Sequence, residues 1–155
     1  MTFSRRDLAC LLPVLPGAVA AAQEKDTKSG KKGDGAIPVL ASKTYRLDDL
    51  PVRSSANGAS RNRPVFNGVT TRGQHIVMHI SELAPGQAPH PPARQPHEEV
   101  IVIRKGTLEV TLNGQVTTLG PGAVIFSAFN DLNGWKNVGT TPAQYYVISL
   151  EDHSA

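Results

Sequence analysis

The chain has 155 residues, a formal net charge of +3 and a single cysteine, Cys10. Residues 61–155 carry seven basic and seven acidic side chains, so the excess positive charge lies in the first 60 residues. No clustered basic surface of the kind that nucleic acid requires is therefore expected. The length suits one folded domain, and that domain has no thiol, which excludes disulfides and cysteine catalysis within it.

Residues 1–22 have the pattern of a secretory signal peptide. Ser4-Arg5-Arg6 supplies a charged start, an apolar run follows, and Ala20-Ala21-Ala22 offers small residues for cleavage before Gln23. The run is shorter than the ~20 residues of a membrane span. The paired arginines resemble a twin-arginine export signal, and an ordinary signal peptide that carries two arginines is the alternative. We expect a periplasmic or secreted protein with no membrane association after cleavage.

Residues 23–60 are expected to form a flexible linker and an N-terminal arm. Residues 23–35 are rich in Lys, Gly and Asp and show no apolar periodicity, which is typical of a tether. Ile37–Leu40 and Lys43–Leu47 are candidates for short strands, and Asn57-Gly58 marks a turn.

Residues 61–153 are predicted to form an all-β domain, since short apolar strands alternate with Gly- and Pro-rich turns. The expected strands are Val65–Val69, Ile76–Leu83, Val100–Ile103, Leu108–Leu112, Val116–Leu119, Val124–Phe126 and Gln144–Leu150. Val100–Ile103 is an unbroken β-branched run, as expected of a central strand covered on both faces. Asn113-Gly114 predicts a type I′ hairpin. The pattern favours a small antiparallel jelly-roll sandwich or barrel.

Residues 85–106 read PGQAPHPPARQPHEEVIVIRKG and join a Pro-rich segment to an apolar strand. Alternate residues of a strand share a face, so Ala93, Gln95, His97 and Glu99 are expected to face one side of an extended segment. The stretch resembles the first motif of the cupin family, in which two histidines precede a glutamate, six residues and a glycine. Glu99 and Gly106 match that motif, whereas Ala93 and Gln95 occupy the histidine positions.

Residues 119–139 resemble the second cupin motif. Gly122 matches its glycine, Asn133 stands at its histidine position and Asn137 matches its later asparagine. The resemblance extends over Glu82–Gly139 and includes small exported bacterial cupins. It implies a double-stranded β-helix barrel, with the N-terminal arm lying over this barrel or over that of a partner. A homodimer is therefore a candidate assembly.

Metal centres in cupins use two histidines and a glutamate from the first motif and one histidine from the second. The corresponding positions here are occupied by Ala93, Gln95, Glu99 and Asn133. Alanine cannot ligate a metal, and carboxamide oxygens are weak neutral donors for transition metals. The resemblance therefore implies a degenerate metal site with no cofactor, in which Glu99, His97 and Gln95 are only weak candidates. A divalent Fe, Mn, Ni or Zn ion in a variant site is the alternative.

The expected ligand-binding residues of the barrel cavity are Ala93, Gln95, Glu99, Asn133, His97 and Trp135. The amides of Gln95 and Asn133 are suited to donate hydrogen bonds to a buried Glu99, with Trp135, Phe126 and Phe129 as candidate apolar walls. His79 is expected to be satisfied within its strand. The predicted function is binding of a small polar molecule, or a non-catalytic role. A metal-dependent dioxygenase or isomerase with a variant site is the alternative.

Overall fold

The computed structural model describes residues 36–151, so the predicted signal peptide and residues 23–35 of the linker lie outside the described residues. Within 36–151 there is no α-helix and no helix that could span a membrane. The elements are η1 (Leu47–Asp49), β1 (Arg53–Ser54), β2 (Ser60–Val69), β3 (His75–Leu83), β4 (Ala93–Arg94), β5 (Glu98–Lys105), β6 (Leu108–Leu112), β7 (Gln115–Leu119), β8 (Val124–Ser127), β9 (Leu132–Asn137) and β10 (Ala143–Glu151).

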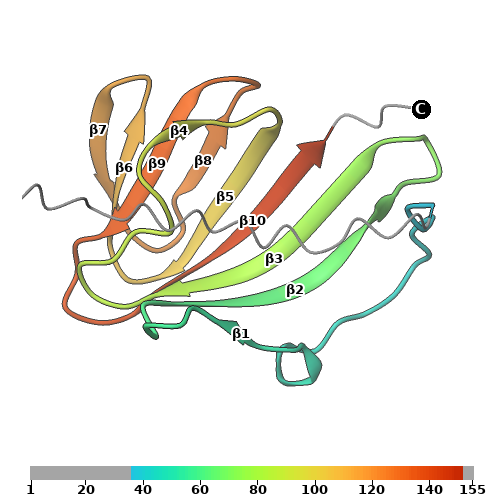
Figure 1. The fold of residues 1–155 in the computed structure, drawn as a ribbon, viewed down its shortest axis with the longest axis horizontal. Coiled ribbons are helices and arrows are strands. Elements are labelled where there is room, and N and C mark those ends of the chain that lie inside the picture. Colours follow the sequence, from blue (N-terminus) through green and yellow to red (C-terminus); the bar gives the residue numbers. More distant parts are fainter. Residues whose placement is uncertain (1–35, 152–155) are drawn as a thin grey trace, which may run out of the picture. The chain divides into compact units, whose positions relative to one another are not determined.

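The strands form two antiparallel sheets that face each other (Figure 1). One has the order β1-β2-β3-β10-β5-β8 and the other the order β4-β9-β6-β7. Alternate residues point between the sheets and form the core, which includes Leu83, Ile101, Leu108, Trp135 and Tyr145. Burial of this apolar surface is the main stabilising term. The predicted all-β jelly-roll fold is confirmed.

Glycines hold two of the turns that set strand register. Asn113 and Gly114 have φ values of 49° and 85°, which is the type I′ geometry predicted for the β6–β7 hairpin. Gly106 ends the first motif with φ of +81°, and a Cβ there would lie 2.6 Å from the Cα of Ala143. The β5–β6 turn therefore passes directly against the start of β10, which only glycine allows.

The sequence pattern predicted one extended segment from Ala93 to Glu99, but the structure has two separate strands there. β4 belongs to the four-stranded sheet and β5 to the six-stranded sheet, so the chain crosses between sheets after Arg94. Pro96 lies in the crossing, where its missing N–H and fixed φ interrupt strand pairing. Alternation along this segment therefore does not determine which way the side chains point.

The described part of the N-terminal arm contains less strand than predicted. Val39 forms a single parallel bridge to Val69, and residues 43–46 form no strand. Instead η1 is tied to β2, because Arg63 Nη1 donates to the carbonyl oxygens of Leu47 (3.4 Å) and Leu50 (3.1 Å). The Arg63 side chain therefore ties η1 to β2, while the turn itself is closed by backbone bonds from Asp49 N to Arg46 O and from Leu50 N to Leu47 O.

β5 is covered on one face rather than on both, which corrects the prediction made from its apolar run. Ile101 and Ile103 point into the core and are 0% and 1% exposed. Val100 and Val102 alternate with them, point to the outer face of the sheet and remain partly exposed. The run is apolar on two faces, but within residues 36–151 only the inner one is fully buried.

Candidate functional site

Glu99 is a buried carboxylate at the start of β5, only 8% exposed. Its Oε2 accepts a hydrogen bond from Asn133 Nδ2 at 3.2 Å, and its Oε1 lies 3.3 Å from His97 Nε2. Asn133 Nδ2 also donates to Ser127 Oγ at 2.7 Å. Polar partners on both oxygens stabilise a carboxylate that burial alone would disfavour.

Strand pairing brings these residues together from both sheets. Glu99 and Ser127 are paired on β5 and β8, whereas Asn133 lies on β9 and is paired with Ala93 on β4. Gln95 lies between β4 and β5, where its backbone carbonyl accepts a hydrogen bond from the Asn130 N–H at 2.9 Å. Ala93, Asn133, Glu99 and His97 are therefore contiguous, and the contact seen for Gln95 is made by its backbone.

A cavity of about 210 Å³ lies beside this cluster. Glu99 and Trp135 line it, whereas Ala93, Gln95, His97 and Asn133 do not. Its other lining side chains include His79, Ser81, His90, Arg61, Asn62 and Tyr145. The walls of the cavity therefore come from β2, β3 and β10 among other elements, and not from β4.

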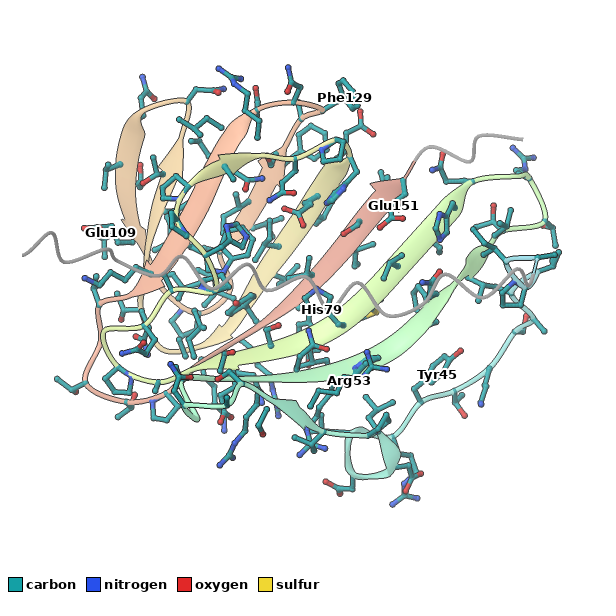
Figure 2. All side chains as sticks on the ribbon, viewed as in Figure 1. Tyr45, Arg53, His79, Glu109, Phe129 and Glu151 are labelled. Atoms are coloured by element: carbon teal, nitrogen blue, oxygen red, sulfur yellow. The ribbon has the colours of Figure 1, made fainter. Side chains whose placement is uncertain are left out.

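His79, Ser81 and Tyr145 are cavity residues that the sequence motifs did not identify. Ser81 on β3 is paired with Tyr145 on β10, and His79 is two residues away on the same face of β3. Alternation along β3 was the available signal, because it places 79, 81 and the core residue Leu83 on one side. Figure 2 shows His79 projecting from the middle of β3.

Burial controls the ionisation of two of these side chains. It lowers the pKa of His79, although the charge of Glu99 partly opposes the shift. The ring is also held by a contact of 3.0 Å between His79 Nδ1 and Ser81 Oγ. Burial raises the pKa of Tyr145 to about 12. At neutral pH the cavity therefore contains a neutral imidazole and a protonated phenol.

Trp135 brings an unsatisfied donor to the cavity wall. The residue is 6% exposed, and its indole Nε1 is buried without a hydrogen-bond partner among residues 36–151. The Tyr145 ring packs against the indole edge-on, with the ring centroids 5.6 Å apart. An unpaired buried donor costs about 1–3 kcal/mol. Trp135 also interacts with the Tyr145 hydroxyl, and this contact lowers the pKa of the phenol against the larger effect of burial.

Phe126 and Phe129 do not wall the cavity, contrary to expectation. Each is 57% exposed, and neither lines the cavity. Phe126 points to the outer face of β8, paired with Val100 of β5. Phe129 follows β8 at the rim of the barrel, well away from His79 (Figure 2). Of the three predicted aromatic walls, Trp135 is the one that lines the cavity, together with Tyr145.

Comparison with known proteins places this architecture in a family. Residues 79–149, which run from the cavity strand β3 to β10, match the family model described as a cupin domain. The domain belongs to the cupin superfamily. No curated protein matches the chain.

Solved cupin structures share the fold at low sequence identity. KdgF from Halomonas sp. is 12% identical with a TM-score of 0.60, over 72% of this chain and 96% of that one. An RmlC-like cupin from Shewanella frigidimarina is 12% identical with a TM-score of 0.59, over 74% and 95%. A sugar phosphate isomerase from Silicibacter pomeroyi is 12% identical with a TM-score of 0.58, over 71% and 76%. At these identities the likeness is one of fold.

The residues at the cupin metal positions do not fit a transition metal. Ala93 has no donor atom, and the Asn133 side chain turns its Nδ2 donor, not an oxygen, toward Glu99. Within residues 36–151, no three His, Cys, Asp or Glu side chains form a group that could hold a metal ion. One carboxylate with a single imidazole beside it and amides at the other positions is a poor site for a metal that prefers several imidazoles.

Proposed function

We propose that this cupin binds a small polar molecule in the cavity beside Glu99 without a bound metal. The observation that carries the proposal is that buried Glu99 lines this cavity beside Trp135, whose Nε1–H makes no hydrogen bond of good geometry among residues 36–151. Glu99 supplies the complementary acceptor, because an ionised carboxylate has about four lone-pair sites and its contacts with Asn133 and His97 use two of them. A ligand hydroxyl group can accept a hydrogen bond from an N–H group and donate one to the Glu99 carboxylate, so it complements both kinds of partner.

Size and charge narrow the ligand class. A cavity of about 210 Å³ corresponds to about seven water volumes of ~30 Å³ each, which suits a molecule of several non-hydrogen atoms. Glu99 repels an anion, and the Arg61 guanidinium that also lines the cavity is already paired with Glu82 at 3.6 Å. Neutral His79 and protonated Tyr145 offer hydrogen bonds without charge. We therefore propose a small uncharged polyhydroxyl compound.

A metal-dependent enzyme is the second candidate, and one contact favours it. His97 Nε2 lies 3.3 Å from Glu99 Oε1, so an imidazole already contacts the carboxylate that stands at the family's glutamate position. The relative from Silicibacter pomeroyi is described as a sugar phosphate isomerase. Two donors without a third are insufficient for tight divalent-metal binding, so metal-free binding is the stronger proposal.

The test uses the only tryptophan of the chain as its reporter. Trp135 fluorescence and isothermal titration calorimetry are followed with glycerol, erythritol and glycolate as probes. We expect saturable binding of a polyol and none of glycolate. Glu99→Gln should weaken polyol binding by about tenfold or more, whereas Glu98→Gln, one residue away on the other face of β5, should not. Failure of both polyols to bind would contradict the proposal, and tight stoichiometric binding of Mn(II) or Zn(II) would favour the metalloenzyme.

We also propose that the domain acts outside the cytoplasm. The support is the signal-like pattern of residues 1–22, with Arg5-Arg6 before the apolar run and three alanines before Gln23. The chain has no cysteine after Cys10, so the mature protein can fold in an oxidising compartment without forming any disulfide.

A further inference from the structure

We propose that the groove between the N-terminal arm and β2 is a second binding site, and that it takes an organic anion with an aromatic body. The groove encloses about 700 Å³, which lies within the range of about 300–1,000 Å³ that small-molecule sites occupy. The barrel cavity beside Glu99 encloses about 210 Å³. His79 and Asn62 line both spaces, so the groove and the barrel cavity share a wall.

The chain from Leu40 to Arg53, called the arm loop below, is fastened to β2 at both of its ends. At one end the backbone N–H of Leu40 donates to the carbonyl oxygen of Val69 at 2.8 Å. Gly68 permits this approach, because a Cβ there would lie 2.6 Å from Leu40 Cδ2. At the other end Arg53 begins β1, which pairs with β2. The arm loop therefore runs along β2 between two fixed points (Figure 1).

Between these two points β2 has an open edge that faces the arm loop. β1 covers the start of this edge, and the bridge from Val39 to Val69 covers its end. Within the described chain, no strand pairs with residues 63–68 on that side. The Arg63 guanidinium crosses the gap to η1 and braces it. A groove bounded by a braced loop and a sheet edge is already formed before a ligand arrives, which lowers the cost of binding.

Aromatic and aliphatic side chains give the groove its apolar walls. Tyr45 of the arm loop packs against Phe66 of β2, with ring centroids 6.0 Å apart and an angle of 49° between the ring planes. Tyr45 is 38% exposed, so part of its ring is open to a ligand. A further aromatic ring packs well beside such a pair, at centroid distances of about 4.5–7 Å. The other apolar lining residues are Leu50, Pro51, Pro64, Val65, Val77 and Met78.

The charged side chains of the groove are mostly cationic. Among the described residues, Lys43, Arg46 and Arg53 line it together with the single acid Asp49, so the formal balance is +2 from three cations and one anion. Arg46 and Asp49 meet at 4.0 Å with side chains 84% and 74% exposed, and such exposed pairs are weak. The Arg53 guanidinium has no hydrogen-bond or ion-pair partner among residues 36–151. The groove therefore offers a charge that an anion can neutralise.

An aromatic carboxylate uses both features of the groove. A guanidinium such as that of Arg53 can donate two parallel hydrogen bonds to a carboxylate. Lys43 Nζ lies 5.3 Å from the centre of the Tyr45 ring, so cation and aromatic wall already lie side by side. Figure 2 shows Tyr45 and Arg53 on the stretch of chain that runs along β2. None of these three residues lines the barrel cavity, so the inference is independent of polyol binding there.

Isothermal titration calorimetry of the purified chain with cinnamate tests the proposal, with cinnamyl alcohol and acetate as matched probes. We expect saturable binding of cinnamate and binding of the neutral alcohol that is weaker by about tenfold or more. Acetate carries the charge without the aromatic body and should show no saturable binding. Added salt should weaken the binding of cinnamate by screening. Failure of cinnamate to bind, or an alcohol that binds as tightly, would overturn the proposal.

A matched pair of arginine variants locates the site. Arg53→Gln should weaken cinnamate binding by about fivefold or more. Arg72→Gln is the control and should leave it unchanged, because Arg72 is an exposed arginine in the β2–β3 turn that does not line the groove. Circular dichroism and thermal unfolding establish that both variants are folded. Equal affinities of the two variants would overturn the assignment to the groove. Tighter cinnamate binding by Glu99→Gln, which removes a negative charge from the barrel cavity, would place the anion there and overturn it as well.

Discussion

The side-chain amide of Asn133 on β9 donates to the carboxylate of Glu99 on β5 at 3.2 Å and thereby joins the two sheets. The same amide nitrogen bonds Ser127 on β8. In a position where cupin metal centres have a histidine, this chain has a residue that stabilises a carboxylate directly. The sheet-to-sheet connection that a metal would provide is made here by hydrogen bonds.

Asn133→Leu should lower the free energy of unfolding by about 1–3 kcal/mol. Leucine has a similar volume but leaves buried Glu99 and Ser127 without this donor. Urea unfolding measures the loss. Ser127→Ala is the control, because it leaves the Asn133–Glu99 bond in place and should cost less. A leucine variant as stable as the wild type would show that the bond contributes little.

Gly106→Ala should destabilise the barrel far more than Gly114→Ala. Both glycines have positive φ, +81° and +85°, but a Cβ on Gly114 meets nothing within 4 Å whereas one on Gly106 meets Ala143 Cα at 2.6 Å. We expect about 1 kcal/mol for Gly114→Ala and more than about 3 kcal/mol for Gly106→Ala. Chemical denaturation of both variants checks the difference, and equal losses would contradict the steric explanation.

His79 should make the protein less stable as the pH falls below 6.5. Burial lowers the pKa of His79 in the folded state, so below 6.5 the unfolded chain binds the proton more readily than the folded one. Stability is then present above 6.5 and is lost as the pH falls toward the folded pKa. His79→Gln should reduce this slope in thermal unfolding measured at several pH values. An unchanged slope would contradict the assignment to His79.

Tyr145 should make the protein less stable as the pH rises above 10. Its pKa is raised to about 12 in the folded state, so from pH 10 upward the unfolded chain releases the phenol proton first. The loss by pH 12 amounts to about 2 kcal/mol. Comparison of Tyr145→Phe with the wild type in alkaline unfolding isolates this contribution. Tyr45→Phe, in the N-terminal arm, controls for the loss of a hydroxyl elsewhere.

The export proposal predicts a mature protein that begins near Gln23. Replacement of Arg5 and Arg6 by lysine should stop export by a twin-arginine route, whereas an ordinary signal peptide tolerates the exchange because the positive charge is kept. Cell fractionation and the mass of the processed protein distinguish these results. An uncleaved chain in the cytoplasm of the wild type would refute export itself.

The fold could be predicted because its signals are local. Asn113-Gly114 specifies a hairpin by backbone conformation alone, and the spacing from Glu99 to Gly106 encodes a strand and its turn. The orientation of Ala93 and Gln95 could not be predicted in the same way. Alternation holds only within one strand, and β4 ends at Arg94, before a crossing that contains Pro96 and leads to the other sheet.

Only some residues of the candidate site could be predicted from the sequence, for a related reason. Glu99 and Trp135 could be assigned to the cavity, but His79, Ser81 and Tyr145 belong to strands that the motifs do not mark. They reach the cavity through pairing between β3 and β10, residues far apart in the sequence. Such long-range pairing is a property of the whole topology and leaves no short motif.

The position of β10 also determines when the barrel can form. This strand, the last of those described, lies in the middle of its sheet and pairs with both β3 and β5. Until residues 143–151 have been synthesised, β3 and β5 each present an unpaired apolar edge, which is a template for aggregation. The six-stranded sheet therefore cannot be completed before β10 has been synthesised, so its folding does not proceed strand by strand along the chain.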